Sequence, residues 1–167
     1  ALPLLLRGAG NVTGAGNVGA GSTVAAGVDA STIGTLPFSS PLTGASGVTF
    51  SLKLDSTTGT FDLLTAAGAV ALGSSTLSLT DIGSGSWNGT TNAFSIVHGS
   101  SISGTFTGLA DGSTVNVGSN AFTLNYTGTD VILTAIAIPE PSTYAAMIGA
   151  LVLAGAAWNR RRSSVRA

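Results

Sequence analysis

The chain lacks cysteine altogether and has one histidine and one lysine in 167 residues. Without cysteine it has no disulfide, no thiolate nucleophile and no cysteine-ligated metal. A catalytic triad needs a base, a nucleophile and an orienting carboxylate in one geometry. His98 precedes Gly99-Ser100, but serine is too abundant here for that proximity to carry weight. We interpret His98 as a surface or strand-end residue and predict that the protein is not an enzyme.

Charge is also scarce, at 8% of the chain against about 25% in typical globular proteins. Within residues 1–138, Arg7 and Lys53 oppose six aspartates, which gives a net charge of −4. Without a basic face, nucleic-acid binding is excluded. The aspartates occur singly, often beside glycine or serine, so we expect them to cap turns. We predict no cofactor and no metal, with a calcium ion at Asp111 or Asp130 as the alternative. The six are Asp29, Asp55, Asp62, Asp81, Asp111 and Asp130.

Glycine and small or apolar residues fill most of the chain. There are 24 glycines, and hydrophobic residues make up 44%. Disordered chains are poor in apolar residues, so this composition favours a packed β structure. No stretch before Ser142 keeps an apolar period of 3.6 residues over three turns, so we expect residues 1–138 to be nearly free of helix.

Alternating apolar residues predict the strands. One expected strand face holds Val48, Phe50, Leu52 and Leu54, and the opposite face holds Thr49, Ser51 and Lys53. Residues 115–117 and 122–126 flank a short glycine-containing turn, which is typical of a hairpin. The residues expected to be buried are Phe50, Leu52, Leu54, Leu77, Leu79, Phe122 and Leu124.

The segment 8–27 shows a short period, with Val12, Val18 and Val24 evenly spaced among small residues. Short strands separated by small corner residues are typical of β-solenoids. A flexible glycine-rich linker is the alternative interpretation.

Several segments of residues 19–136 resemble the C-terminal end of passenger proteins that carry autotransporter-associated β-strand repeats. They are GAGSTVAAG, GVTFSLKLD, TFDLLTAAGAVALGSSTLSL and SGTFTGLADGSTVNVGSNAFTLNYTGTDVILTAI. The resemblance implies a mainly β fold, the end of a right-handed parallel β-helix closed by a C-terminal hairpin cap. We expect the hairpin region 115–133 to blunt that end, and residues 1–138 to be the extracellular, solenoid-like end of a longer precursor.

The tail has three parts in order. Pro139-Glu140-Pro141 precedes an uncharged run, 142–159, which Arg160-Arg161-Arg162 follows. As a helix the run would be about 27 Å long, close to the ~30 Å of a bilayer core. We therefore predict a single short transmembrane helix, with the arginines favouring a cytoplasmic C-terminus. An ordinary anchor that is never processed is the alternative.

Residues 139–167, with these parts in this order, resemble the PEP-CTERM sorting signal of bacterial proteins, which is recognised by exosortase, a membrane-embedded transpeptidase. The resemblance implies that Pro139, Glu140 and Pro141 form the recognition motif and that Arg160, Arg161 and Arg162 set topology. It implies export, an intermediate anchored in the inner membrane, and release to the cell surface or extracellular matrix. Exosortase is the expected partner, and exopolysaccharide a further one.

Two classes of function follow from these resemblances. The first is a non-catalytic protein of the cell surface or extracellular matrix. The alternative is a carbohydrate-binding or glycan-processing surface protein whose active module lies upstream of residue 1. An exposed aromatic cluster would favour the alternative, and Trp87 with Phe94 is the available pair.

Overall fold

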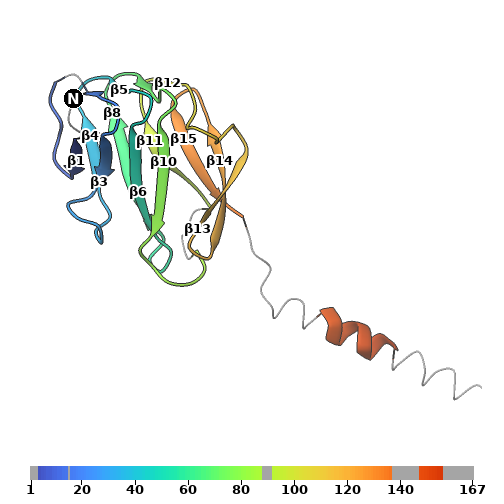
Figure 1. The fold of residues 1–167 in the computed structure, drawn as a ribbon. Helices are drawn as coiled ribbons and strands as arrows, with labels where there is room; N and C mark the ends of the chain where they lie inside the picture. Colours follow the sequence, from blue (N-terminus) through green and yellow to red (C-terminus); the bar gives the residue numbers. More distant parts are fainter. Residues whose placement is uncertain (1–3, 15, 88–91, 137–146, 156–167) are drawn as a thin grey trace, which may run out of the picture. The chain divides into compact units, whose positions relative to one another are not determined.

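The computed structural model describes residues 4–14, 16–87, 92–136 and 147–155. The chain divides into two compact units, Ala1–Ile136 and Ala137–Ala167. The first unit is built from β-strands in three sheets (Figure 1), and its described residues contain no helix. The prediction of a mainly β, nearly helix-free body is therefore confirmed.

Sheet A contains four parallel strands, and the short strand β7 (Thr60–Phe61) pairs antiparallel with one of them. The four, in spatial order, are β1 (Leu5–Gly8), β3 (Thr23–Ala26), β6 (Thr49–Asp55) and β10 (Thr76–Asp81). Sheet C consists of four short parallel strands, β2 (Gly16–Val18), β5 (Leu42–Gly44), β9 (Val70–Ala71) and β12 (Ile102–Ser103).

Sheet B joins a parallel part to an antiparallel part. Its parallel strands are β4 (Thr35–Phe38), β8 (Leu63–Ala66) and β11 (Ala93–His98). The antiparallel strands are β13 (Ser113–Val117), β14 (Asn120–Tyr126) and β15 (Asp130–Ala135), and β15 pairs with β11.

The chain visits the three sheets in rotation. It runs through β2, β3 and β4, then β5, β6 and β8, then β9, β10 and β11, adding one parallel strand to each sheet in every circuit. The strands of sheet C begin at Gly16, Leu42, Val70 and Ile102, so each circuit is somewhat longer than the one before it. Parallel pairing stacks the equivalent residues of successive circuits directly on one another.

A glycine corner followed by threonine opens each strand of sheet A after β1. Gly47 has a φ of +83° and Gly73 a φ of +56°, a region that side chains disfavour. A Cβ at Gly73 would lie 1.9 Å from the carbonyl oxygen of Gly44, so glycine is required there. Each threonine amide then donates to the circuit before it. These bonds are Thr23 to Leu4 (2.7 Å), Thr49 to Ser22 (2.9 Å) and Thr76 to Val48 (2.7 Å). Thr107, which lies in a turn, makes the equivalent bond to Ser75 (2.8 Å).

The core lies between the three sheets, where alternate side chains of each strand point inward. Five of the seven residues predicted to be buried are fully so, namely Phe50, Leu52, Leu54, Phe122 and Leu124. Each such side chain stabilises the fold by about 1.5–3 kcal/mol through burial. Leu77 and Leu79 face the core but are only half-buried, because β10 is the last strand of its sheet.

The even spacing of the three valines has a different origin from the predicted one. Val18 lies on β2 of sheet C, Val24 on β3 of sheet A, and Val12 bridges to Phe38 of sheet B. The three valines therefore belong to three different sheets, one valine to each sheet within a single circuit. Equivalent strands of the same sheet recur only after a whole circuit, which is much longer than the spacing between the valines. The described part of segment 8–27 carries strands, so the interpretation as a flexible linker is wrong.

The predicted hairpin is present as β13 and β14, joined by a turn at Gly118 and Ser119. The hydroxyl of Tyr126 holds the chain that leads into it, accepting from the amide of Phe106 (3.0 Å) and donating to the carbonyl of Leu109 (2.9 Å). Burial raises the pKa of the Tyr126 phenol above its ordinary value.

The second unit is described only at residues 147–155, which form a helix. In the described part of the chain, no helix has both the length and the apolar character that crossing a membrane requires. The transmembrane helix predicted for the run 142–159 is therefore not supported, and residues 142–146 and 156–159 of that run lie outside the described residues.

Candidate functional site

The residues predicted to carry sorting lie outside the described residues. They are Pro139, Glu140, Pro141, Arg160, Arg161 and Arg162. Between these two groups, the helix at residues 147–155 exposes all of its large apolar side chains. Met147, Ile148, Leu151, Val152 and Leu153 are exposed by 58–73%.

His98 lies in the strand-rich unit, where it forms a polar cluster with Ser95 and Asp130. Its Nδ1 atom is 2.9 Å from Oδ1 of Asp130, and the Ser95 hydroxyl donates to the same oxygen at 2.8 Å. Ser95 precedes a register irregularity between β11 and β15, and its hydroxyl also lies 3.0 Å from the carbonyl oxygen of Val97. The cluster therefore closes the irregular part of the β11–β15 ladder.

The order of contacts in this cluster does not match a catalytic triad. In a triad the histidine lies between carboxylate and serine, whereas here the carboxylate of Asp130 lies between the other two side chains. Partial burial acts to raise the pKa of Asp130, but hydrogen bonds from Thr129, His98 and Ser95 outweigh it and hold the pKa below its ordinary value. The arrangement stabilises a carboxylate, and none of the described contacts joins the Ser95 hydroxyl to the imidazole of His98.

A buried ion pair joins two circuits at a corner of sheet A. Nζ of Lys53 on β6 lies 2.7 Å from Oδ2 of Asp62, and both side chains are almost fully buried, with exposures of 5% and 0%. The same carboxylate accepts the amides of Lys53 (2.8 Å) and Gly34 (2.7 Å), and the ammonium also donates to the carbonyl of Ala26 at 2.6 Å. These contacts attach the chain between β3 and β4 to the next circuit.

The sequence interpretation did not identify this pair. Lys53 was expected on the outer face of its strand, and it does lie on that side. The corner formed by residues 27–34 packs over it, so closely that a Cβ at Gly27 would lie 3.1 Å from its Nζ atom. A signal was present: Lys53 is the single lysine of the chain, stands among apolar residues, and is followed closely by Asp62.

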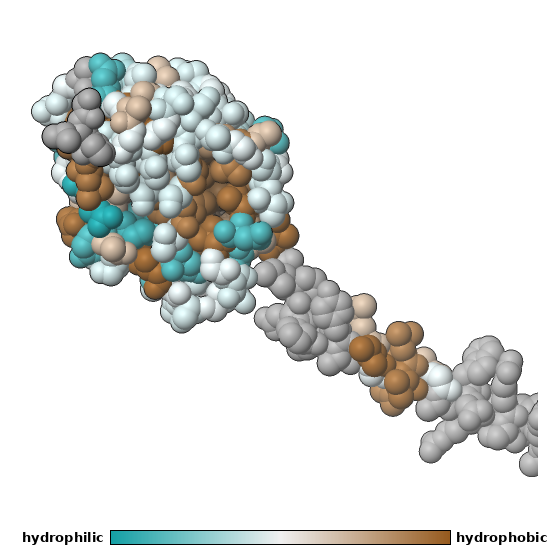
Figure 2. All heavy atoms as spheres, viewed as in Figure 1, coloured by the Kyte–Doolittle hydropathy of each residue, from teal (hydrophilic) through white to brown (hydrophobic). Residues whose placement is uncertain are grey.

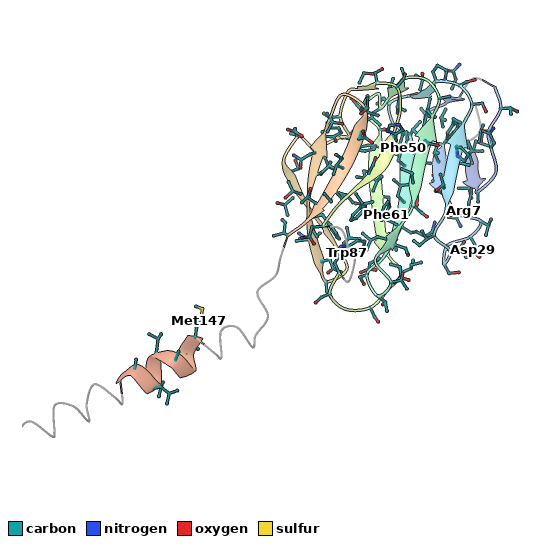
Figure 3. The ribbon with its side chains drawn as sticks, turned by 180° about the vertical axis from the view of Figure 1, so that it is seen from behind. Arg7, Asp29, Phe50, Phe61, Trp87 and Met147 are labelled. Atoms are coloured by element: carbon teal, nitrogen blue, oxygen red, sulfur yellow. The ribbon has the colours of Figure 1, made fainter. Side chains whose placement is uncertain are left out.

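Aromatic rings gather at one end of this unit, where Figure 3 shows Phe61 and Trp87. Phe94 stacks on both, with ring centroids 4.3 Å from Phe61 and 4.8 Å from Trp87. Phe122 contacts Trp87 and Phe94 edge-on, at 5.6 and 5.8 Å. Trp87 is partly buried against the core, so its ring covers part of the core and does not stand out as an exposed aromatic surface.

A polar network fixes the loop that carries Trp87. The side chain of Asn120, which is 5% exposed, accepts the Trp87 amide at 2.6 Å and donates to Gly85 and to Asp81. Asp81 in turn accepts the Gly83 amide at 2.9 Å. The carboxyamide of Asn120 therefore uses both its oxygen and its nitrogen in structural contacts.

The other aspartates also hold turns or neighbouring strands. Asp29 accepts the amide of Ser31, Asp55 that of Thr57, and Asp111 that of Tyr126. Within the described residues, no group of three or more acidic or histidine side chains could hold a metal ion. Turn capping by aspartate, expected from the sequence, is confirmed at Asp29, Asp55 and Asp81. It is wrong for Asp62, whose carboxylate is buried against Lys53.

Comparison with known proteins identifies no relative. No protein-family model matches the chain, and neither a curated protein nor a solved structure matches it at a significant level.

Proposed function

We propose that the chain is a non-catalytic, exported protein of the cell surface or extracellular matrix, and that an exosortase processes it through residues 139–167. The observation that carries this proposal is the order of the tail, in which a Pro-Glu-Pro motif, an uncharged run and an arginine cluster follow one another. The helix at 147–155 supports it, because exposed apolar side chains favour transfer out of water.

The proposal assigns a separate role to each part of the tail. Pro139, Glu140 and Pro141 are the recognition motif, and prolines on both sides of the glutamate favour an extended backbone that a protease cleft can bind. Arg160, Arg161 and Arg162 keep the C-terminus in the cytoplasm. The protein is held at the inner membrane until exosortase cleaves the tail.

For the body, we propose the end of a right-handed parallel β-helix with a hairpin cap. The support is the repeated rotation through sheets C, A and B, with parallel pairing between successive circuits and antiparallel strands β13–β15 at the end. Exopolysaccharide of the matrix is the proposed neighbour of this body. No observation in the described residues favours the alternative of a carbohydrate-binding or glycan-processing protein.

The test is to follow the mature C-terminus in native cells by intact mass and membrane fractionation. Glu140→Ala should leave membrane association intact and slow processing, whereas replacing Arg160, Arg161 and Arg162 by serine should weaken membrane retention. Deleting the exosortase should abolish processing of the wild-type chain. Processing of Glu140→Ala at the wild-type rate would remove the recognition role assigned to this residue, and processing without exosortase would refute the proposal.

A further inference from the structure

Strand β10 leaves one edge of sheet A open. In the described part of the chain it pairs with β6 alone. The next circuit begins to cover it, since the amide of Thr107 donates to Ser75. The chain then turns away at Gly108, whose φ is +73°, and continues into the hairpin of sheet B. The hairpin expected to blunt this end therefore extends sheet B, and among the described strands none pairs with the outer edge of β10.

The hydrogen-bonding groups of this edge can be assigned from the ladder. The amides of Thr76 and Ile82 donate to the carbonyls of Val48 and Leu54, at the two ends of β6. Alternate residues of a strand point their amide and carbonyl to the same side. The amides and carbonyls of Leu77 and Leu79 therefore point away from β6, toward the open edge.

Residues 76–80 of β10 carry no feature that discourages a second strand from pairing there, and the charge of the strand is confined to its last residue, Asp81. Natural edge strands are usually protected by charge, proline or a bulge, and residues 76–80 contain none of these. Figure 2 shows apolar surface exposed beside β10, on the side of β13. The half-buried residues Leu77, Leu79 and Val115 belong to the two strands that flank this surface.

Apart from its last residue, the sequence of this edge strand is a palindrome. Residues 76–80 read Thr-Leu-Ser-Leu-Thr in both directions. In an antiparallel pair of two copies centred on Ser78, Leu77 of each copy lies opposite Leu79 of the other, with both leucines on the core-facing side. Leu77 and Leu79 are the residues whose amides and carbonyls point outward. In this register each Leu77–Leu79 pair exchanges two backbone hydrogen bonds, which gives four in all. The two Asp81 carboxylates lie at opposite ends, about 20 Å apart, and do not repel.

We propose that β10 is a homotypic docking strand that pairs antiparallel with β10 of a second copy of this chain, with the two-fold axis at Ser78. Such a contact is isologous and closes at the dimer. It joins the two A sheets into one sheet and covers the apolar surface beside each β10. The inference is independent of the tail and of its processing.

Cross-linking tests the register, and the absence of cysteine makes the experiment specific. In the proposed pair the two Ser78 residues form a non-hydrogen-bonded antiparallel pair with Cα atoms about 4.5 Å apart, a separation that a disulfide spans. The full chain is kept in mild detergent. Ser78→Cys should form a disulfide dimer at least about tenfold faster than the matched control Thr43→Cys, an exposed position on β5 of sheet C. Equal rates at the two positions would overturn the proposal.

Charge substitution tests the contact without a covalent bond. Ser78 is exposed, so its replacement does not disturb the core. Ser78→Lys and Ser78→Glu should each weaken dimerisation by about tenfold, because like charges then face each other at the axis. Mixing the two variants should restore a dimer, measured by light scattering, while Thr43→Lys behaves as wild type. A monomeric wild-type chain would refute the proposal, and so would a mixture that is no more dimeric than either variant alone. Either result would also be obtained if β10 bound a different protein instead of a second copy.

Discussion

Replacing Asp62 by alanine should destabilise the protein more than replacing its partner Lys53 by methionine. The two changes remove one ion pair, but they leave different groups behind. After Lys53→Met, the carboxylate keeps two amide donors, from Gly34 and from residue 53 itself. After Asp62→Ala, the buried ammonium keeps only the carbonyl of Ala26, and both amides lose their acceptor.

The magnitudes follow from burial. Breaking a buried ion pair by removing one partner costs about 3–5 kcal/mol, and each amide left unsatisfied adds about 1–3 kcal/mol. We therefore expect Lys53→Met to lower the free energy of unfolding by about 3 kcal/mol. Asp62→Ala should lower it by at least about 5 kcal/mol, which approaches the whole stability of a typical domain.

The assay is urea unfolding of the full chain, followed by far-ultraviolet circular dichroism. Asp55→Ala is the matched control, because that exposed carboxylate also accepts a backbone amide, from Thr57, and should cost far less. The reasoning would be refuted if Lys53→Met and Asp62→Ala each cost less than about 1 kcal/mol, the range of a surface pair. It would also fail if Lys53→Met were the more damaging change.

Three further predictions concern core packing, stability at low pH and the hydroxyl group of Tyr126. Leu52→Ala should lower the free energy of unfolding in urea by about 2–5 kcal/mol, and the half-buried Leu79→Ala by clearly less. Because the pKa of Asp130 lies below its ordinary value of 3.8, its stabilisation is present above that value and is lost as the pH falls through the folded-state pKa. Asp130→Asn should therefore flatten the acid side of the stability profile below about pH 4 in a circular-dichroism titration. Tyr126→Phe leaves the amide of Phe106 without its acceptor and should cost about 1–3 kcal/mol by thermal melting, whereas an unchanged melting temperature would contradict that role.

Local pattern predicted the strands well, because alternation of apolar residues records which side of a strand faces the core. Phe50, Leu52 and Leu54 on β6 follow that rule, and so does the β13–β14 hairpin. The half-burial of Leu77 could not be predicted from the sequence of its own strand. It depends on whether a further strand covers β10, which is a matter of tertiary packing.

The period and the ion pair were missed for different reasons. The corner glycines Gly21 and Gly47 each precede a threonine by two positions, at Thr23 and Thr49, so a search for repeats at that longer spacing would have found the circuit. Lys53 follows the alternation, but its burial comes from a corner that the previous circuit contributes. Such a contact is invisible to any local pattern.

The attachment of the tail to β15 has a mechanical consequence. β15 lies between β14 and β11 in sheet B, and the amide of Ile136 still donates to Ala121. A pulling force directed along β15 therefore acts against the ladders on both of its sides at once. Strands loaded in this way must shear many hydrogen bonds together, whereas a strand at a sheet edge can be peeled off one bond at a time. A body loaded along β15 therefore resists extension better than it would if the load entered through a strand at a sheet edge.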